Sequence, residues 1–409
     1  MKNSTYSLII RNAYLRTPDK VLDIGIVGDR IARIEATISE KGEVEIDAGE
    51  NFVSPGLVDP HTHMDKSLTI MGERFPRCND TSYVIDGPTS RNQSIKAGLE
   101  YYGTATPAEI KQHIIDHARM QIINGTLYTR THVDVDPVAE TKAVEAALEA
   151  KDDLCELLGL QVVAFAQSGL LGDERIEPLL RKSAEMGVDL IGGLDPATLE
   201  NNIEGALDLA FRLAREYEIP LDHHIMDPST LGIYTLQRLA AKTIENGYQG
   251  KVTCSHSWCL GDAPPDWLEE RIPLFKDAGL KFVTCYTTTP YNFPVRRILQ
   301  AGLTLACGSD NIRDFWLVMG NGDLVEELLV ETQRLNMTSN GEMDLLWEMI
   351  TIEGAKVMGI EDDYGIETGK KADLVIFDEP SPQWVIIKQA RKTHVIKNGK
   401  VIARDGKLL

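Results

Sequence analysis

The stretch VSPGLVDPHTHMDKS at residues 53–67 joins an apolar run to two histidines. His61 and His63 are two residues apart, so on a β-strand their rings point to the same side and can bind one metal ion. Seven more short apolar stretches follow, at 126–136, 160–169, 187–196, 219–227, 251–258, 281–290 and 303–311. Between them lie amphipathic helical patterns. Eight strand-helix units over about 250 residues predict a (β/α)8 TIM barrel of the α/β class.

The two ends of the chain differ from this middle part. Residues 6–36 and 372–404 alternate apolar and polar side chains, with turn signals at Gly28-Asp29 and Asn398-Gly399. We therefore expect both termini to build one small β-sandwich domain outside the barrel. The predicted boundaries are 1–56 and 363–409 for the two parts of the sandwich and 57–362 for the catalytic barrel.

Composition narrows the classes of partner. The chain has 409 residues and a net charge of −20, which argues against nucleic acid or an anionic membrane as a partner and favours a small neutral molecule. No apolar run approaches the roughly 20 residues of a membrane span, and the first residues lack a signal-peptide pattern, so we expect a cytoplasmic protein. The six scattered cysteines predict buried thiols rather than disulfides.

Ligand-type side chains stand at the ends of several predicted strands, where TIM barrels place their catalytic groups. Besides His61 and His63, these are His224 and Asp310. Three imidazoles and a carboxylate suit one Zn²⁺, with Fe²⁺ as the alternative, and leave a position for water. Such an ion lowers the pKa of bound water from about 16 to near 7.

Other histidines and cysteines fit a metal site less well. His113 and His117 are four apart on a predicted helix but lack the glutamate of a zinc-protease motif, so we interpret them as helix-surface residues. His223 faces away from His224 on the same strand. Cys254 and Cys259 lack the further ligands of a structural zinc site. The long polar segment 72–94 is expected to form a loop over the mouth of the barrel.

The string PGLVDPHTHMDKS, together with the split terminal domain, resembles the amidohydrolase superfamily over essentially the whole chain. Its cytosine-deaminase-like branch is the most similar, because Asp227 lies three residues after His224 and Gln167 ends the third strand. The strand at 187–196 has no lysine to bridge a second ion, which favours a mononuclear site. Strings such as GTLYTRTHVDVD and SDNIRDFW are similar to enzymes of this branch that act on s-triazines.

The resemblance implies a function and roles. The expected reaction is hydrolysis of an exocyclic amino or alkylamino group on a small heterocycle by metal-activated water, with an s-triazine such as N-isopropylammelide as substrate. Asp227 is expected to shuttle protons from apolar surroundings beside Ile225 and Met226, while His256 and Asp310 act on the attacking water. The expected substrate-binding residues are Gln167, Lys66, Asp195, Asn311 and Trp316.

Three alternatives stay open at this point. A cytosine or isoguanine deaminase is one, although Asn311 stands where cytosine enzymes are expected to carry a second aspartate. A hydrolase of cyclic amides is another, and a silent relative that only binds its ligand is the third. Nucleotide deaminases of the PCxxC type are excluded because that motif is absent. A homo-oligomer, either a dimer or a tetramer, is expected.

Overall fold

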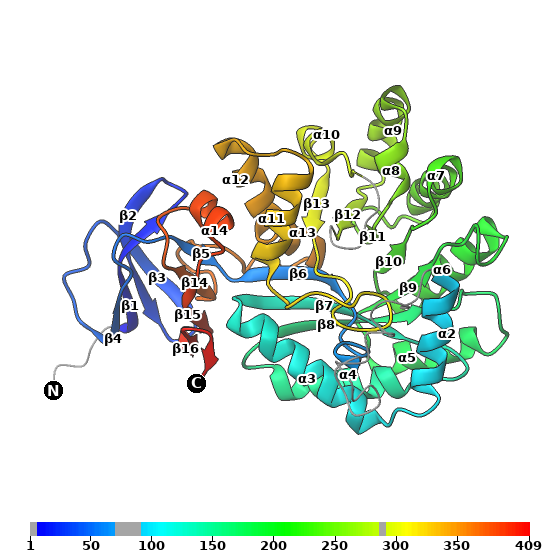
Figure 1. The fold of residues 1–409 in the computed structure, drawn as a ribbon, viewed down its shortest axis with the longest axis horizontal. Coiled ribbons are helices and arrows are strands. Elements are labelled where there is room, and N and C mark those ends of the chain that lie inside the picture. Colours follow the sequence, from blue (N-terminus) through cyan, green and yellow to red (C-terminus); the bar gives the residue numbers. More distant parts are fainter. Residues whose placement is uncertain (1–5, 70–90, 286–291) are drawn as a thin grey trace.

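A computed structural model describes residues 6–69, 91–285 and 292–409 of the chain. Figure 1 shows a smaller, sheet-rich part that carries both ends of the chain and a larger ring of alternating strands and helices. Among the described residues, no helix combines the length and apolar character that crossing a membrane requires.

The larger part is a parallel barrel in which all eight predicted strands are present. Its strands pair side by side in chain order, with parallel neighbours throughout. They are β6 (Leu57–Thr62), β7 (Thr126–Asp134), β8 (Gly159–Ala166), β9 (Leu190–Leu194), β10 (Leu221–His224), β11 (Val252–Ser255), β12 (Lys281–Thr284) and β13 (Thr304–Cys307). The strands of such a barrel are buried on both faces, so their sequences are nearly continuous apolar runs.

The first and last strands approach each other and nearly close the barrel. Thr62 and Asp310 form a parallel bridge, and the Asp310 N–H donates to the His61 carbonyl oxygen at 2.9 Å. A Cβ atom at Gly308 would lie 2.6 Å from the same carbonyl oxygen, so glycine is needed there. This close approach brings the ends of β6 and β13 together.

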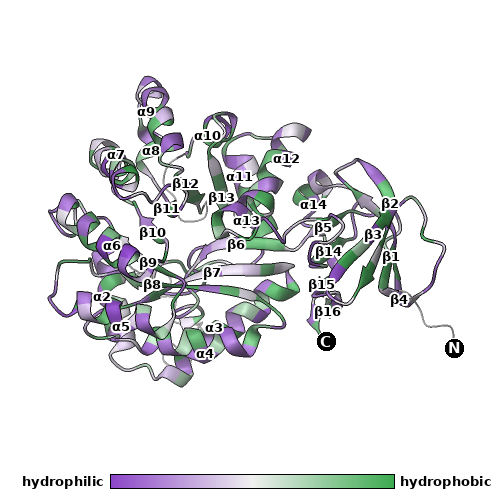
Figure 2. Ribbon diagram, turned by 180° about the vertical axis from the view of Figure 1, so that it is seen from behind, coloured by the Kyte–Doolittle hydropathy of each residue, from purple (hydrophilic) through white to green (hydrophobic). Residues whose placement is uncertain are grey.

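Helices with one apolar face form the outer layer. In α6 (Ile203–Tyr217), Leu207, Phe211 and Ala214 are buried at helical spacing. Figure 2 shows the same mixture of polar and apolar residues on α3 (Pro107–Ile123) and α4 (Lys142–Leu154). The other helices of this part are α2 (Arg91–Tyr102), α5 (Ile176–Met186), α7 (Ser229–Glu245), α8 (Cys259–Asp262), α9 (Pro265–Asp277), α10 (Val295–Gln300), α11 (Leu324–Arg334), α12 (Asn340–Met349) and α13 (Ile352–Met358).

The smaller part consists of two sheets. The first is entirely N-terminal and contains β1 (Tyr6–Leu15), β2 (Lys20–Val27), β3 (Arg30–Glu35) and β4 (Gly42–Asp47). The second joins both ends of the chain and contains β5 (Val53–Pro55), β14 (Leu374–Phe377), β15 (Lys392–Lys397), β16 (Lys400–Arg404) and β17 (Lys407–Leu408), while α14 (Pro382–Lys388) lies between β14 and β15. One apolar cluster contains Ile10 and Ile26 of the first sheet together with Leu374 and Ile396 of the second, so the predicted sandwich from both termini is present.

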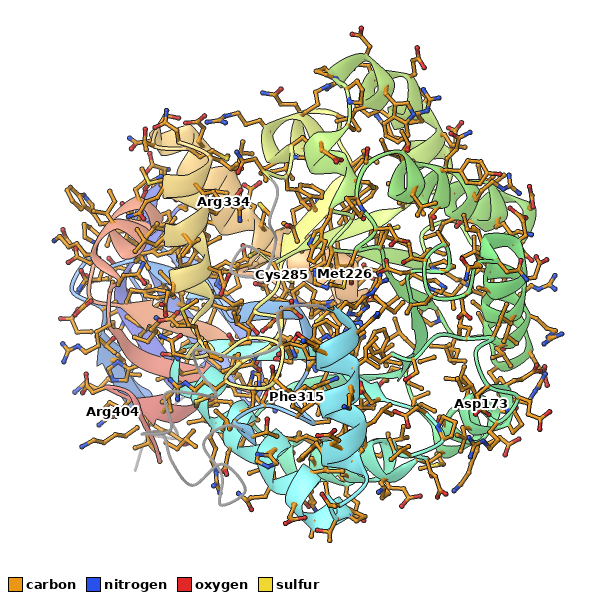
Figure 3. All side chains as sticks on the ribbon, turned by 45° about the vertical axis from the view of Figure 1, so that its right-hand side comes forward. Asp173, Met226, Cys285, Phe315, Arg334 and Arg404 are labelled. Carbon is orange, nitrogen blue, oxygen red and sulfur yellow. The ribbon has the colours of Figure 1, made fainter. Side chains whose placement is uncertain are left out.

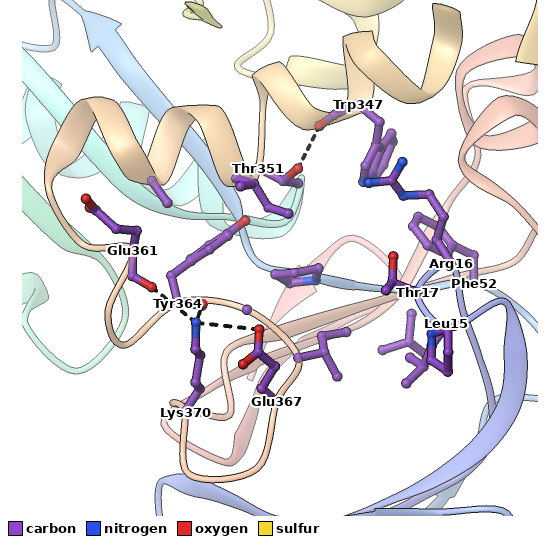
Figure 4. Close-up of a pocket in the computed structure, with 17 residues that line it drawn as sticks. Leu15, Arg16, Thr17, Phe52, Trp347, Thr351, Glu361, Tyr364, Glu367 and Lys370 are labelled. Atoms are coloured by element: carbon purple, nitrogen blue, oxygen red, sulfur yellow. Dashed lines mark hydrogen bonds and ion pairs between the residues drawn. The ribbon is translucent and has the colours of Figure 1, made fainter. Parts of the chain in front are cut away.

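A cavity of about 620 Å³ lies where the sandwich meets the barrel, between Phe52, Trp347 and Tyr364 (Figure 4). Both of its basic side chains already have partners within the chain. Arg16 pairs with Glu348 at 2.6 Å, and the Lys370 ammonium donates to the Tyr364 carbonyl oxygen at 2.9 Å. The cavity is remote from the strand ends that carry the predicted ligands.

Some sequence expectations need correction. His117 does not lie on the helix surface: it is fully buried, and its Nδ1 is 2.7 Å from Ser67 Oγ, because α3 packs against the barrel on that side. Cys155 is exposed at the end of α4, unlike the four buried thiols at 254, 259, 285 and 307, and Cys78 lies outside the described residues. Of the loop predicted at 72–94, residues 72–90 lie outside the described part, and α2 already begins at Arg91.

Candidate metal centre and active site

Histidine and aspartate side chains converge at the carboxyl end of the barrel. The ligand atoms of His61, His63 and Asp310 all lie within 4.8 Å of one another, and those of His61, His132 and His224 form an overlapping group. The Nε2 atoms of His63 and His224 are 3.3 Å apart. Asp310 Oδ1 is 3.4 Å from His63 Nε2 and 3.5 Å from His61 Nε2.

These spacings fit the shell of a small divalent ion. Four ligands bound tetrahedrally at about 2.0–2.1 Å would lie about 3.3–3.4 Å from one another. The Nε2 atoms of His63 and His224 are close enough either to share one proton or to bind one ion together. His61 Nε2 is buried and has no hydrogen-bond partner among the described residues. The residues present therefore fit a metal.

Burial keeps the imidazoles in the form that binds metal. Desolvation, followed by the charges of neighbouring groups, holds the pKa of His63 and the pKa of His224 well below the usual value. Imidazole must be neutral to donate its lone pair to an ion. The two residues are thus prepared for ligation at neutral pH.

His256 follows β11 and lies beside the same group. Its ring centre is 4.9 Å from that of His61 and 5.0 Å from that of His224. Burial lowers the pKa of His256 to about 4, so the ring is neutral at pH 7. The backbone at His256 has φ +66°, and its N–H donates to the Val283 carbonyl oxygen at 2.8 Å, which fixes the turn that presents the ring.

A narrow pocket opens onto these rings. Three of the five predicted substrate-binding residues line it, namely Gln167, Asn311 and Trp316, together with Met226 and Phe165. The space enclosed by the described side chains is only about 20 Å³, enough for a single ion or water. Figure 3 places Met226 near the middle of the ring and Asp173 at its periphery.

Lys66 lies behind the pocket rather than in its wall. It is fully buried, and its Nζ donates to Asp134 Oδ1 at 2.6 Å and to Gln167 Oε1 at 2.9 Å. Burial opposes the charge of Lys66, but the carboxylates of Asp134 and Asp65 outweigh this, and the pKa of Lys66 is raised. Because an ammonium only donates, Gln167 must turn its oxygen to Lys66 and its NH2 group elsewhere.

Asp227 has polar rather than apolar surroundings. Its Oδ1 accepts a hydrogen bond from the Thr198 hydroxyl at 2.5 Å and faces Arg91 at 3.4 Å. Arg91, at the start of α2, also pairs with Asp195, whose Oδ1 accepts from the Asp227 N–H at 3.0 Å. Burial and the nearby Asp227 raise the pKa of Asp195 to about 6. Asp227 and Asp195 thus form a carboxylate pair beside the pocket, with Arg91 as the cation.

Sequence reasoning missed several buried polar residues of this region. His132 of β7 lies 4.2 Å from His61, ring centre to ring centre. Its Nε2 is 3.4 Å from Asp222 Oδ1. The sequence does contain a pattern that indicates His132. Arg130, His132 and Asp134 are alternate residues of one buried strand, so all three side chains point to the barrel interior. Arg91 carried no such signal, because it follows a polar segment without periodicity.

Comparisons with known proteins agree with this architecture. The profile described as "Amidohydrolase family" matches residues 97–403. The chain is 59% identical to an N-isopropylammelide isopropyl amidohydrolase from Pseudomonas sp. (strain ADP), over 98% of each chain. The crystal structure of an N-isopropylammelide isopropylaminohydrolase from Burkholderia multivorans has a TM-score of 0.90 at 30% identity and covers 99% of this chain and 100% of its own. For a 5-methylcytosine deaminase from Klebsiella pneumoniae, the TM-score is 0.85 at 26% identity, with 97% of this chain and 98% of that chain covered.

Proposed function

The chain belongs to the amidohydrolase family, and from this premise we propose that it removes an alkylamino group from an s-triazine of the N-isopropylammelide type. It is a hydrolase of carbon-nitrogen bonds other than peptide bonds. The observation that carries the proposal is the convergence of His61, His63 and Asp310 at the barrel mouth. The choice of substrate is supported by the 59% identity to the Pseudomonas enzyme over nearly the whole chain.

The ligands that we propose for a single metal ion are His61, His63, His224 and Asp310. Nitrogen donors with one carboxylate suit Zn²⁺, and Fe²⁺ is the alternative. When bound, the ion supplies a water of lowered pKa and polarises the substrate. No lysine occurs in the strand β9, where a second bridged ion would require one, which supports a mononuclear site.

The remaining steps are proton transfers by side chains of this chain. As the water oxygen bonds to the ring carbon, the water must lose a proton, a ring nitrogen must gain one, and the amine must leave protonated. His256, neutral at pH 7, is proposed to accept a hydrogen bond from the attacking water. Asp310 is proposed to take the water proton and pass it to the leaving amine, while Asp227 exchanges a proton with the ring.

A second candidate is a cytosine-type deaminase, which would release ammonia instead of an alkylamine. The similarity to the 5-methylcytosine deaminase favours it, although at 26% identity this similarity is weaker than that to the triazine enzymes. Asn311 lines the pocket and donates to Asp314 Oδ2 at 2.7 Å. An amide at this position offers the substrate different hydrogen bonds from an aspartate.

Two measurements test the proposal. Elemental analysis of the purified protein is expected to find about one equivalent of zinc or iron, and none in the double variant His61→Ala/His63→Ala. Turnover of N-isopropylammelide, ammelide, cytosine and isoguanine should then be followed by release of amine or ammonia. Release of isopropylamine as the preferred reaction supports the triazine assignment. Preferred release of ammonia from cytosine favours the second candidate, and two tightly bound metal ions per chain contradict the mononuclear site.

We also propose that the enzyme works in the cytoplasm on its small-molecule substrate alone, as a homodimer or homotetramer. Light scattering coupled to gel filtration tests the oligomeric state. A monomer at micromolar concentration would contradict this part of the proposal.

A further inference from the structure

A network of buried polar side chains lies beneath the proposed metal ligands. Arg130 Nη1 donates to Asp222 Oδ2 at 2.9 Å. The other oxygen of Asp222, Oδ1, is 2.6 Å from Ser255 Oγ, and Ser255 Oγ is 2.8 Å from His61 Nδ1. All four residues are nearly or fully buried. The network thus joins β7, β10 and β11 to the ligand at the end of β6.

The chemistry of the network allows only one arrangement of protons. Arg130 can only donate, and a carboxylate can only accept, so Asp222 is the acceptor at both of its oxygens. The Ser255 hydroxyl must therefore donate its proton to Asp222. Its oxygen is left to accept a hydrogen bond from His61 Nδ1, which places the imidazole proton on Nδ1.

We propose that Ser255, held by Asp222 and Arg130, is a positioning residue that keeps the proton of His61 on Nδ1 and leaves Nε2 as the donor atom for the metal. This inference rests on the assignment of His61 as a ligand in the proposed function. The position of Nε2 agrees with it, since this atom is the one that lies 3.5 Å from Asp310 Oδ1. Partners that orient a ligating histidine through its second nitrogen strengthen metal binding in other proteins, and their loss weakens it by about 10- to 100-fold.

Asp222 also faces His132, whose Nε2 lies 3.4 Å from the same Oδ1. Arg130 pairs with the other oxygen of Asp222 at 2.9 Å, and a buried guanidinium at this distance favours the charged carboxylate, which can only accept hydrogen bonds. His132 Nε2 makes no hydrogen bond to Asp222 at this distance, so the ordering role of Asp222 concerns His61, through Ser255.

The test is the affinity for Zn²⁺, measured by competition with a chromophoric chelator on the full-length protein after metal removal. In Ser255→Ala, His61 Nδ1 loses its acceptor and either nitrogen can carry the proton, so affinity should fall by about 10- to 100-fold. In Asp222→Asn, the amide oxygen turns to Arg130 and the NH2 group to Ser255. The serine then donates to Nδ1 and the His61 proton moves to Nε2, so the loss should exceed that of Ser255→Ala.

Ser257→Ala is the matched control. Ser257 is fully buried two residues further on, and its hydroxyl has no hydrogen-bond partner among the described residues. Its removal should leave the Zn²⁺ affinity within about twofold of the wild type. The unfolding midpoint of each metal-free variant shows whether the core is intact. If Ser255→Ala does not fold, Ser255→Thr, which keeps the hydroxyl, should bind Zn²⁺ nearly as tightly as the wild type.

The outcomes separate this inference from the proposed function. A wild-type protein that binds no divalent ion contradicts the metal site itself. A wild type that binds Zn²⁺, together with a folded Ser255→Ala variant of equal affinity, overturns the positioning role and leaves the metal site standing. Equal losses in the alanine variants at 255 and 257 also overturn it, because the effect would then be one of general packing.

Discussion

Asp227 lies three residues after His224, and its carboxylate is held by Thr198 and faces Arg91. This arrangement fixes the carboxylate at one side of the pocket, where Met226 forms the wall. Asp227→Asn keeps the size of the side chain and removes its capacity to exchange a proton. We expect metal content to persist while kcat falls by about 10²-fold or more, measured by steady-state kinetics and elemental analysis.

Asp189→Asn is a matched control for this variant. Asp189 precedes β9 at the opposite end of the strand and pairs with Lys151 at 2.7 Å. Its replacement should leave kcat unchanged. Loss of metal in Asp227→Asn would reassign Asp227 to the ligands, and near-native turnover with full metal would remove it from the mechanism.

Lys66 and Asp134 form a fully buried ion pair with a separation of 2.6 Å. Lys66→Met would leave the carboxylate without its cation, so we expect a loss of about 3–5 kcal/mol in the free energy of unfolding, measured with urea. Lys111→Met, which removes exposed pairs with Glu149 and Asp153, should cost less than about 1 kcal/mol. If Lys66→Met/Asp134→Leu is no more stable than Lys66→Met, the pairing argument fails.

At the level of residues, the sequence indicated the histidines and the aspartate that lie at or near strand ends and come together in the structure, but not the buried polar residues that contact them. His61, His63 and Asp310 could be predicted because they follow apolar runs that end at the same side of the barrel. Asp222 lies within β10 and Ser255 ends β11, and in such short buried strands a polar residue gives no local sign of what it contacts. Their partners come from other strands and are defined only by the closure of the barrel.

Helices and strands could be predicted where their apolar residues follow a clear pattern along the sequence. The eight strands could be located from their apolar runs, since both faces of each strand are covered. The start of α2 could not, because its sequence has no clear apolar face and only scattered buried residues, such as Gly98 and Tyr102. The helix α3 was correctly predicted, but His117 was wrongly predicted to lie on its exposed surface.

The burial of His117 gives α3 a pH-dependent contribution to stability. Burial lowers the pKa of His117 to about 3, against about 6.5 in the unfolded chain. Below pH 6.5 the unfolded state therefore binds a proton that the folded state does not, and stability is lost as the pH falls. At pH 5 this loss amounts to about 2 kcal/mol relative to pH 7.

Between pH 7 and pH 5, the free energy of unfolding should fall by about 2 kcal/mol less in His117→Gln than in the wild type. Urea unfolding of the metal-free proteins measures this difference. His113→Gln on the same helix is the control, since His113 is half-buried and its removal should change the pH dependence less. If the free energy of unfolding falls equally with pH in the His117 variant and in the wild type, folding does not lower the pKa of His117.

The molecule as a whole combines a barrel with a sandwich that neither end of the chain can build alone. Sequence patterns predicted that the termini meet, because alternating residues at both ends need a common apolar core. They did not predict which strands share a sheet, since the pairing of β5 with β14 joins residues more than 300 positions apart. We propose 1–56, 57–362 and 363–409 as the corresponding parts of the chain.

Deleting residues 366–409 tests this arrangement. The deletion removes β14 to β17, so β5 loses the strand with which it pairs, and the apolar side chains of the N-terminal sheet, Ile10 and Ile26 among them, lose the face that covers them. Exposed strand edges and apolar surface lead to aggregation. We expect the truncated protein to be insoluble on expression. Removal of 405–409 alone, which takes only the short exposed strand β17, should leave a soluble, metal-binding protein. If the long truncation gives a folded protein with unchanged thermal stability, the sandwich is not required, and the barrel would have to be regarded as an independent folding unit.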